Sequence, residues 1–205
     1  MTTMQSITTD IFNYGNEQIT AKKSFIAYFK SQTEQFSNGR LTQIVLEENL
    51  KNKAEEIKRI SDSKFEAITA VLSAFITKEL DSINNIGNSV TANDVAELDL
   101  LSTMTLTQEE FISYYIKYKN KPLAVKKLQQ IHRDIINKPK QVFFPMPKLK
   151  NELLIDFQNQ ANEALEYINK NIIAKNDFEI GLTIDKNMVD VYNKWLNEII
   201  DEYEK

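Results

Sequence analysis

Apolar residues recur at helical spacing along most of the chain, and the longest such segment is unbroken. From about Leu41 to Ile86 there is no glycine or proline. The apolar positions step by four, four and three residues, which is an eleven-residue repeat typical of a nearly straight helix. This stripe consists of Leu46, Leu50, Ala54, Ile57, Ser61, Phe65, Ile68, Leu72, Ile76 and Ile83. The spacing predicts one helix over 41–86, about 65–70 Å long at ~1.5 Å per residue.

The apolar stripe of this long helix needs to be covered. We expect Ile57, Ile68, Leu72 and Ile76 to be buried, because an amphipathic helix turns its apolar side away from water. Two arrangements would cover them: packing against other helices of the same chain, or packing against another subunit or partner. One amphipathic stripe serves both uses equally, so both stay open.

Shorter helices are predicted on both sides of the long one. Glycine favours helix ends, so Gly15 and Gly39 are interpreted as the limits of a first helix over 17–35. Thr91 with Asp94 and Thr107 with Glu110 have the three-residue spacing of capping boxes, which open helices. The remaining helices are expected near 91–101, 107–118, 122–137, 148–170 and 185–203.

Two apolar stripes belong to these flanking helices. The first helix carries Ile19, Ile26, Phe29 and Phe36 along one side. The last carries Met188, Tyr192, Trp195 and Ile199, which we interpret as a core or interface stripe. Residues 178–184 alternate weakly between apolar and polar, which predicts at most one short strand. The pattern therefore predicts an all-α, elongated helical protein.

Three regions follow from the change in helix length along the chain. Residues 1–88 form a long-helix N-terminal region, 89–140 a basic three-helix subdomain, and 141–205 a C-terminal helical region. A chain of 205 residues is also compatible with all three belonging to one domain.

Composition excludes most catalytic chemistry. The chain has no cysteine and a single histidine, His132, so thiolate nucleophiles, cysteine metal clusters and sites with two histidines are impossible. Four glycines are too few for a phosphate-binding loop. We expect a protein that is not an enzyme and that binds no cofactor or metal. No stretch approaches the ~18 apolar residues of a membrane span, so no membrane partner is expected.

The most charged segment lies between residues 117 and 150. It holds ten basic residues and one acidic residue, Asp134, within a chain of net charge -4. Such asymmetry is compatible with a solvated face, with docking to an acidic protein surface, or with nucleic acid. The residues that we expect to contact a partner are Lys119, Lys121, Lys126, Lys127 and Arg133.

A short segment rich in proline and phenylalanine follows this block. Phe143 and Phe144 lie between Pro139 and Pro145. Adjacent aromatic rings outside a helix either plug a core or form an exposed docking strip. In the second case, Phe143 and Phe144 are the apolar anchors for a partner.

Residues 91–131 resemble a pattern in small helical proteins encoded among the head genes of tailed bacteriophages. The similar elements are the Thr-x-x-Asp opening at Thr91, the Leu-Thr-x-Glu-Glu start at Leu106, and the Tyr-Lys-x-x-Pro break at Tyr118. The resemblance implies a virion or morphogenesis role as a connector, head-associated or scaffold-like protein. Many phage scaffolds end in a basic helix, whereas residues 197–205 are acidic.

The expected function is that of a structural or assembly protein. We expect protein partners, self-association or both, in the host cytoplasm or in the virion. The alternative is a small nucleic-acid-binding regulator that uses the basic helices of 107–137. The few arginines, three against 22 lysines, disfavour this alternative because guanidinium is the preferred base-reading group.

Overall fold

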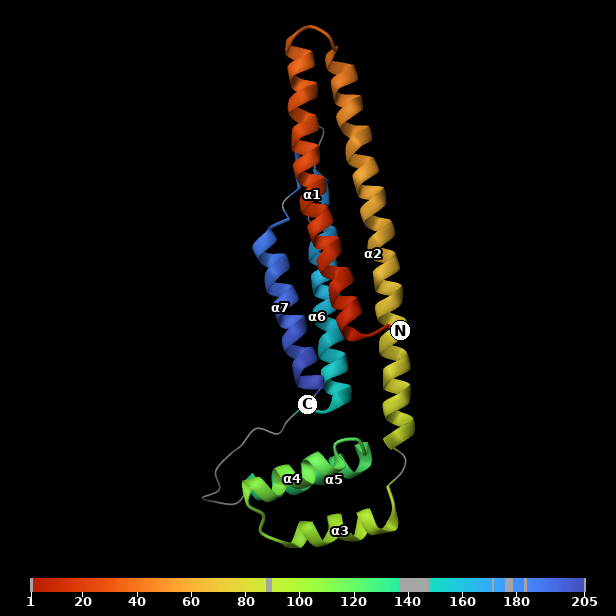
Figure 1. Ribbon diagram of the computed structural model, residues 1–205, viewed down its shortest axis with the longest axis vertical. Helices are drawn as coiled ribbons and strands as arrows, with labels where there is room; N and C mark the ends of the chain where they lie inside the picture. Colours follow the sequence, from red (N-terminus) through yellow and green to blue (C-terminus); the bar gives the residue numbers. More distant parts are fainter. Residues whose placement is uncertain are drawn as a thin grey trace. The chain divides into compact units, whose positions relative to one another are not determined.

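The computed structural model describes residues 2–87, 90–136, 148–170, 172–175, 179–182 and 184–204 (Figure 1). Its helices are α1 (Met4–Ser37), α2 (Gln43–Gly87), α3 (Ala92–Thr103), α4 (Gln108–Tyr118), α5 (Pro122–Ile136), α6 (Lys150–Lys170) and α7 (Lys186–Tyr203). The predicted all-α class is confirmed. The chain divides into two compact units, of which the first contains Met1–Phe75 and Asp156–Lys205 and the second contains Ile76–Ile155.

The long central helix is present as the sequence predicts. α2 runs without interruption for 45 residues. Of the four stripe residues expected to be covered, Leu72 and Ile76 are buried, and Ile57 and Ile68 are half-buried. The eleven-residue repeat therefore identified the correct side of the helix.

The first helix is much longer than predicted. α1 begins at the N-cap Thr3, whose side chain accepts a hydrogen bond from the Ser6 amide, and it passes through Gly15 without a break. The interpretation of Gly15 as a helix boundary was therefore wrong. The helix ends at Ser37 with Asn38 as its C-cap, and the next residue, Gly39, has a positive φ of 72° and donates its amide to the Phe36 carbonyl at 2.9 Å.

In the first unit, a polar contact joins three helices. The hydroxyl groups of Tyr14 on α1 and Ser61 on α2 are 2.6 Å apart, and both are buried. Each also lies within hydrogen-bonding distance of Asn169 Oδ1 on α6, at 3.3 Å from Tyr14 and 3.2 Å from Ser61. Burial of the Tyr14 phenol raises its pKa, since the charged form is disfavoured there. This contact fixes α1, α2 and α6 at one level of the unit.

Beyond this level, α1 and α2 continue side by side as two antiparallel helices (Figure 1). Phe25 of α1 and Ala54 of α2 form a small buried cluster with the half-buried Leu50 and Ile57. The side-chain amide of Asn49 (Nδ2) donates a hydrogen bond of 2.8 Å to Gln32 Oε1. We refer to this stretch, residues 25–60, as the α1–α2 arm.

The last helix, α7, buries a face adjacent to the one that the sequence indicates. α7 lies along α1 and buries Val189, Leu196 and Ile200. Its predicted stripe is only partly covered, since Met188, Tyr192 and Ile199 are half-buried and Trp195 is exposed.

Two short strands connect α6 to α7. β1 (Ile172–Lys175) and β2 (Glu179–Leu182) pair antiparallel, with Ile172 opposite Leu182 and Lys175 opposite Glu179. The prediction of at most one short strand was wrong. A strand in 178–184 is present, but a strand needs a partner for its backbone groups, and the segment directly after α6 supplies it.

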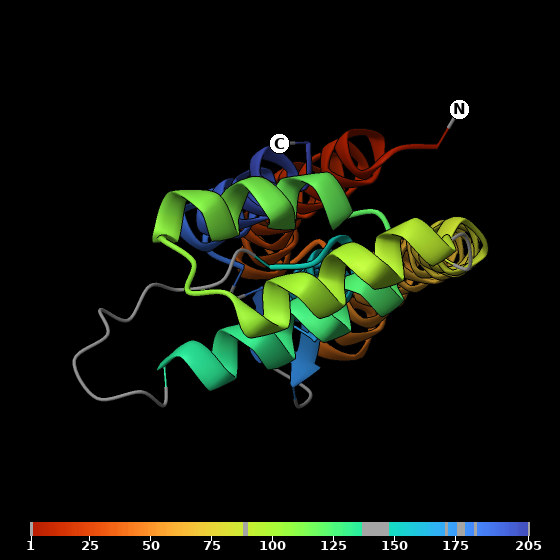
Figure 2. The ribbon, with the colours of Figure 1, turned by 90° about the horizontal axis from the view of Figure 1, so that it is seen from below.

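The second unit contains α3, α4 and α5, with α5 packed against both other helices (Figure 2). Its core is contiguous and apolar, and the Tyr115 hydroxyl donates a hydrogen bond of 2.9 Å to the Lys148 carbonyl. The buried residues of this core are Leu98, Leu101, Leu106, Phe111, Tyr115, Tyr118, Ala124, Val125, Leu128 and Ile131.

Candidate functional site

The described part of the basic segment, residues 117–150, lies in a unit of three helices, and local sequence signals mark where each of these helices begins. Capping boxes open α3 at Thr91 with Asp94 and α4 at Thr107 with Glu110, as predicted. Pro122 is the first residue of α5, where its missing amide hydrogen costs nothing. The resulting chain path brings the lysines at the end of α4 and in the α4–α5 turn against α3.

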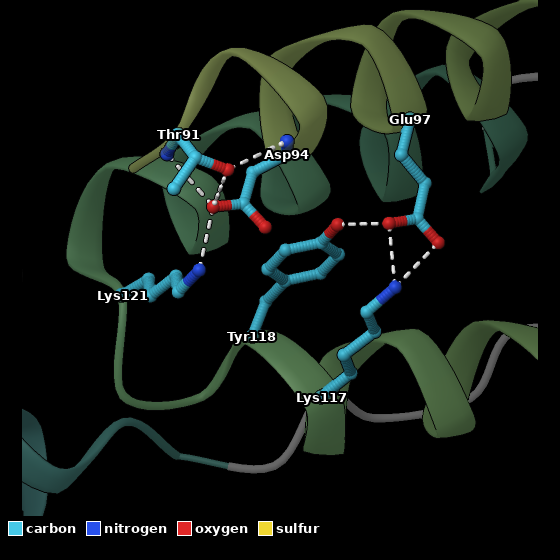
Figure 3. Close-up of polar contacts among 6 residues, drawn as sticks. All are labelled: Thr91, Asp94, Glu97, Lys117, Tyr118 and Lys121. Carbon is cyan, nitrogen blue, oxygen red and sulfur yellow. Dashed lines mark hydrogen bonds and ion pairs between the residues drawn. The ribbon is translucent and has the colours of Figure 1, made fainter. Parts of the chain in front are cut away.

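Glu97 of α3 binds two side chains from the end of α4, the ammonium group of Lys117 and the hydroxyl group of Tyr118. Lys117 Nζ lies 2.6 Å and 2.5 Å from the two carboxylate oxygens of Glu97, and the Tyr118 hydroxyl donates to the same carboxylate (Figure 3). The hydrogen bond from Lys117, followed by that from Tyr118, lowers the pKa of Glu97. Burial, and next the hydrogen bond to Glu97, raise the pKa of Tyr118.

One turn earlier on α3, Asp94 forms a second charged contact. Lys121 Nζ lies 2.5 Å from Asp94 Oδ2, which also accepts hydrogen bonds from the Thr91 amide at 2.8 Å and the Thr91 hydroxyl at 2.9 Å (Figure 3). The Lys121 contact, with these Thr91 bonds, lowers the pKa of Asp94 to about 2. The ammonium groups of Lys117 and Lys121 also lie 5.3 Å and 5.9 Å from the centre of the Tyr118 ring.

The predicted partner-binding lysines do not form one free patch. Lys121 is paired with Asp94, and Lys127 lies 3.3 Å from Asp99 of α3. Lys119 is the C-cap residue of α4. Lys126 and Arg133 are exposed on α5 and form no ion pair within the described part of the chain. Phe143 and Phe144 lie outside the described residues.

The acids of α3 change the electrostatics that the basic segment implies. Residues 90–136 contain six acidic and six basic residues, so their formal charge is zero. We missed Asp94, Glu97 and Asp99 as partners of the lysines because they precede the basic segment in sequence. The only sequence signal for such pairing was that these three acids occur within six residues of one short helix. Such a cluster is also typical of a solvated helix face.

The chain matches no protein-family model, and comparisons with curated proteins and with solved structures found no significant match. No helix in the described ranges has an apolar stretch that is long enough to cross a membrane. Among the same residues, no three His, Asp or Glu side chains are grouped so that they could hold a metal ion.

His132 lies in the core of the second unit. It is buried on α5, and its ring centre is 5.3 Å from that of Phe111. Asp134, two residues later, is exposed and lies on a different face of the helix. The arrangement is that of a packed core histidine, because its burial leaves no open surface beside the ring for a substrate.

The first unit carries exposed apolar side chains on the α1–α2 arm. Ile26, Phe29 and Phe36 follow one side of α1 and are 45%, 42% and 40% exposed. Ile44 and Val45, at the start of α2, are also exposed. An aromatic group lies on α6 and α7, where the ring centre of the half-buried Tyr192 is 5.6 Å from those of the half-buried Tyr167 and the exposed Trp195.

Proposed function

We propose that this chain is a non-enzymatic structural or assembly protein that acts through helix faces. The observation that carries the proposal is the α1–α2 arm, a pair of long helices that leaves Ile26, Phe29 and Phe36 half exposed along one side. Single exposed apolar residues are ordinary on a protein surface, but a row of them on one helix face indicates a contact surface.

The setting that we propose is a tailed-phage particle or its assembly. The support is the resemblance of residues 91–131 to small head-gene proteins, together with the helical fold. The roles that fit are connector, head-associated or scaffold-like protein, in the host cytoplasm or in the virion. The genes next to the coding sequence provide an independent check, since head and terminase genes are expected there.

Light scattering over a concentration series tests the contact surface. We expect either self-association or binding to the product of a neighbouring gene, and we expect Phe29→Ser with Phe36→Ser to weaken it. Leu100→Ser is the control, because Leu100 is also an exposed apolar residue but belongs to the second unit. A chain that is monomeric at every concentration and binds no neighbouring gene product contradicts the proposal.

The nucleic-acid alternative is supported less well than the sequence indicates. Lys117, Lys121 and Lys127 each contact an acid of α3, so these cations are already compensated. Lysines that are available to phosphates give an affinity that falls steeply with salt. We therefore place this alternative second, and a steep salt dependence of binding to duplex DNA would reverse the order.

A further inference from the structure

We propose that copies of this chain bind one another through the exposed face of α5 on one copy and the aromatic face of α7 on the next. This inference rests on the proposed assembly function and names its partner as a second copy. It is drawn from two surfaces of the described residues that are opposite in charge and that each contain exposed apolar side chains.

The α5 face is cationic. Leu123, Lys126, Gln130 and Arg133 occur at intervals of three, four and three residues, so they share one side of the helix, opposite the buried Ala124, Leu128 and Ile131. All four are exposed, with Leu123 at 57%. α5 has three basic residues and one acidic residue, Asp134. Since Lys127 is paired with Asp99, Lys126 and Arg133 are the cations that this face offers a partner.

The α7 face is aromatic and acidic. Trp195 is 42% exposed and packs edge-on against Tyr192. Glu198 and Glu202 follow Trp195 by three and seven residues, so they lie beside it on the same side of the helix. Both glutamates are exposed, and α7 has four acidic and two basic residues. Glu198 lies 3.7 Å from Lys194 Nζ in a solvent-exposed pair, which contributes little and can give way to a cation of a partner.

The two faces complement each other in chemistry. Arginine and lysine bind carboxylates, and they also bind the face of an exposed indole ring by cation–π interaction. Leu123 supplies an apolar side chain against Trp195, and aromatic residues and arginine are the residue types that dominate protein interfaces. A basic amphipathic helix is therefore the partner that α7 fits, and α5 of a second copy is such a helix.

A contact between two different faces has a structural consequence. Each copy still has one free α5 face and one free α7 face after the first contact forms. Such heterologous contacts continue from copy to copy and produce rings or open chains. This outcome fits a protein whose function is assembly.

Charge reversal on each face provides the test. The first variant carries Lys126→Glu with Arg133→Glu, and the second carries Glu198→Lys with Glu202→Lys. Each variant alone has two faces of like charge, so we expect its self-association to weaken by about tenfold or more. An equimolar mixture brings opposite charges together again at both faces, so we expect association to return. The matched control, Lys78→Glu with Lys186→Glu, reverses two exposed lysines that lie outside the α1–α2 arm and off the Trp195 side of α7, so it should associate like the unmodified chain.

Fluorescence and light scattering provide the readout. Trp195 is the single tryptophan of the chain, so its emission reports directly on the α7 face. We expect a blue shift as the concentration of the full chain rises and its reversal at high salt, since salt screens exposed charges. Circular dichroism checks that every variant is folded.

Three results would overturn the inference. In the first, both variants associate as strongly as the unmodified chain. In the second, the equimolar mixture does not recover association. In the third, the emission of Trp195 does not change with concentration. If the chain associates through the α1–α2 arm in spite of these results, the proposed function stands and only this inference fails. If no association or binding of any kind is found, both fail.

Discussion

Gly15 of α1 lies directly against Val189 of α7. A Cβ atom added at Gly15 would be 2.7 Å and 3.1 Å from the two methyl carbons of Val189, and 3.4 Å from the Ile168 methyl group on α6. The missing side chain therefore allows α1 and α7 to approach closely. Gly15 is a packing residue within a continuous helix, and its role depends on a residue 174 positions later in the chain.

Replacing Gly15 with alanine is expected to destabilise the protein. The added methyl group gains up to about 1 kcal/mol of helix propensity, but overpacking costs about 1–3 kcal/mol, so the free energy of unfolding should fall by up to about 2 kcal/mol. In the Gly15→Ala background, Val189→Ala should cost less than it does alone, because it makes room for the new methyl group. Urea unfolding of the double-mutant cycle measures this coupling, and strictly additive effects would contradict it.

Gly39 provides the control for this cycle. It has a positive φ, and no atom lies within 4 Å of a Cβ added there. Gly39→Ala should therefore lower the free energy of unfolding through backbone strain alone. Its effect should be independent of Val189→Ala.

The buried hydroxyl pair of Tyr14 and Ser61 gives a second prediction. Ser61→Ala removes the partner at 2.6 Å and leaves the Tyr14 hydroxyl with longer contacts of 3.3 Å to the Ser61 carbonyl and to Asn169 Oδ1, so the free energy of unfolding should fall by about 1 kcal/mol. Ser63→Ala, at an exposed position two residues later, should be neutral or slightly stabilising. Equal effects of the two substitutions on chemical denaturation would show that the buried pair contributes nothing.

The sequence predicted the elements of this protein better than their packing. The stripe of α2 and the capping boxes at Thr91 and Thr107 are local patterns, and the structure has them where they were expected. Gly15 was wrongly interpreted as a helix boundary. The sequence does not distinguish a glycine that ends a helix from one that lies within a helix and lets a neighbouring side chain pack against it. The partner of the predicted strand was missed because residues 172–175 carry no strand pattern of their own.

The choice of buried face also depends on tertiary context. α7 has two neighbouring apolar faces, and the structure buries Val189 and Leu196 rather than Trp195. Both faces have helical spacing, so periodicity alone does not separate them. The ion pairs of the basic segment could not be predicted from local sequence either. Their charge is evident from the sequence, whereas their pairing with Asp94 and Glu97 depends on how α3 packs.

The stability contributed by Asp94 should depend on pH. Its pKa is lowered to about 2 in the folded chain by Lys121 and Thr91, so the unfolded chain binds the proton more tightly. The contribution is therefore fully present above the ordinary aspartate pKa of about 3.9 and is lost as pH falls toward 2. Asp94→Asn should lower the free energy of unfolding at pH 7, and the difference from the unmodified chain should shrink between pH 4 and pH 2. Asn93→Ala, at the exposed neighbouring position, removes no titratable group, so its effect should not change over this pH range.

Tyr118 links the core of the second unit to the carboxylate of Glu97. The phenyl ring is buried, and the hydroxyl donates to Glu97 beside Lys117. Tyr118→Phe keeps the ring and removes this hydrogen bond, so the free energy of unfolding should fall by about 1–2 kcal/mol. Because the phenol pKa of Tyr118 is raised above its ordinary value, the ultraviolet titration of the folded unmodified chain should contain one more phenol that stays protonated beyond pH 10 than the titration of Tyr118→Phe does. Tyr114→Phe, on the same helix, should leave stability unchanged, and a loss equal to that of Tyr118→Phe would show that the contact with Glu97 does not hold α3 in place.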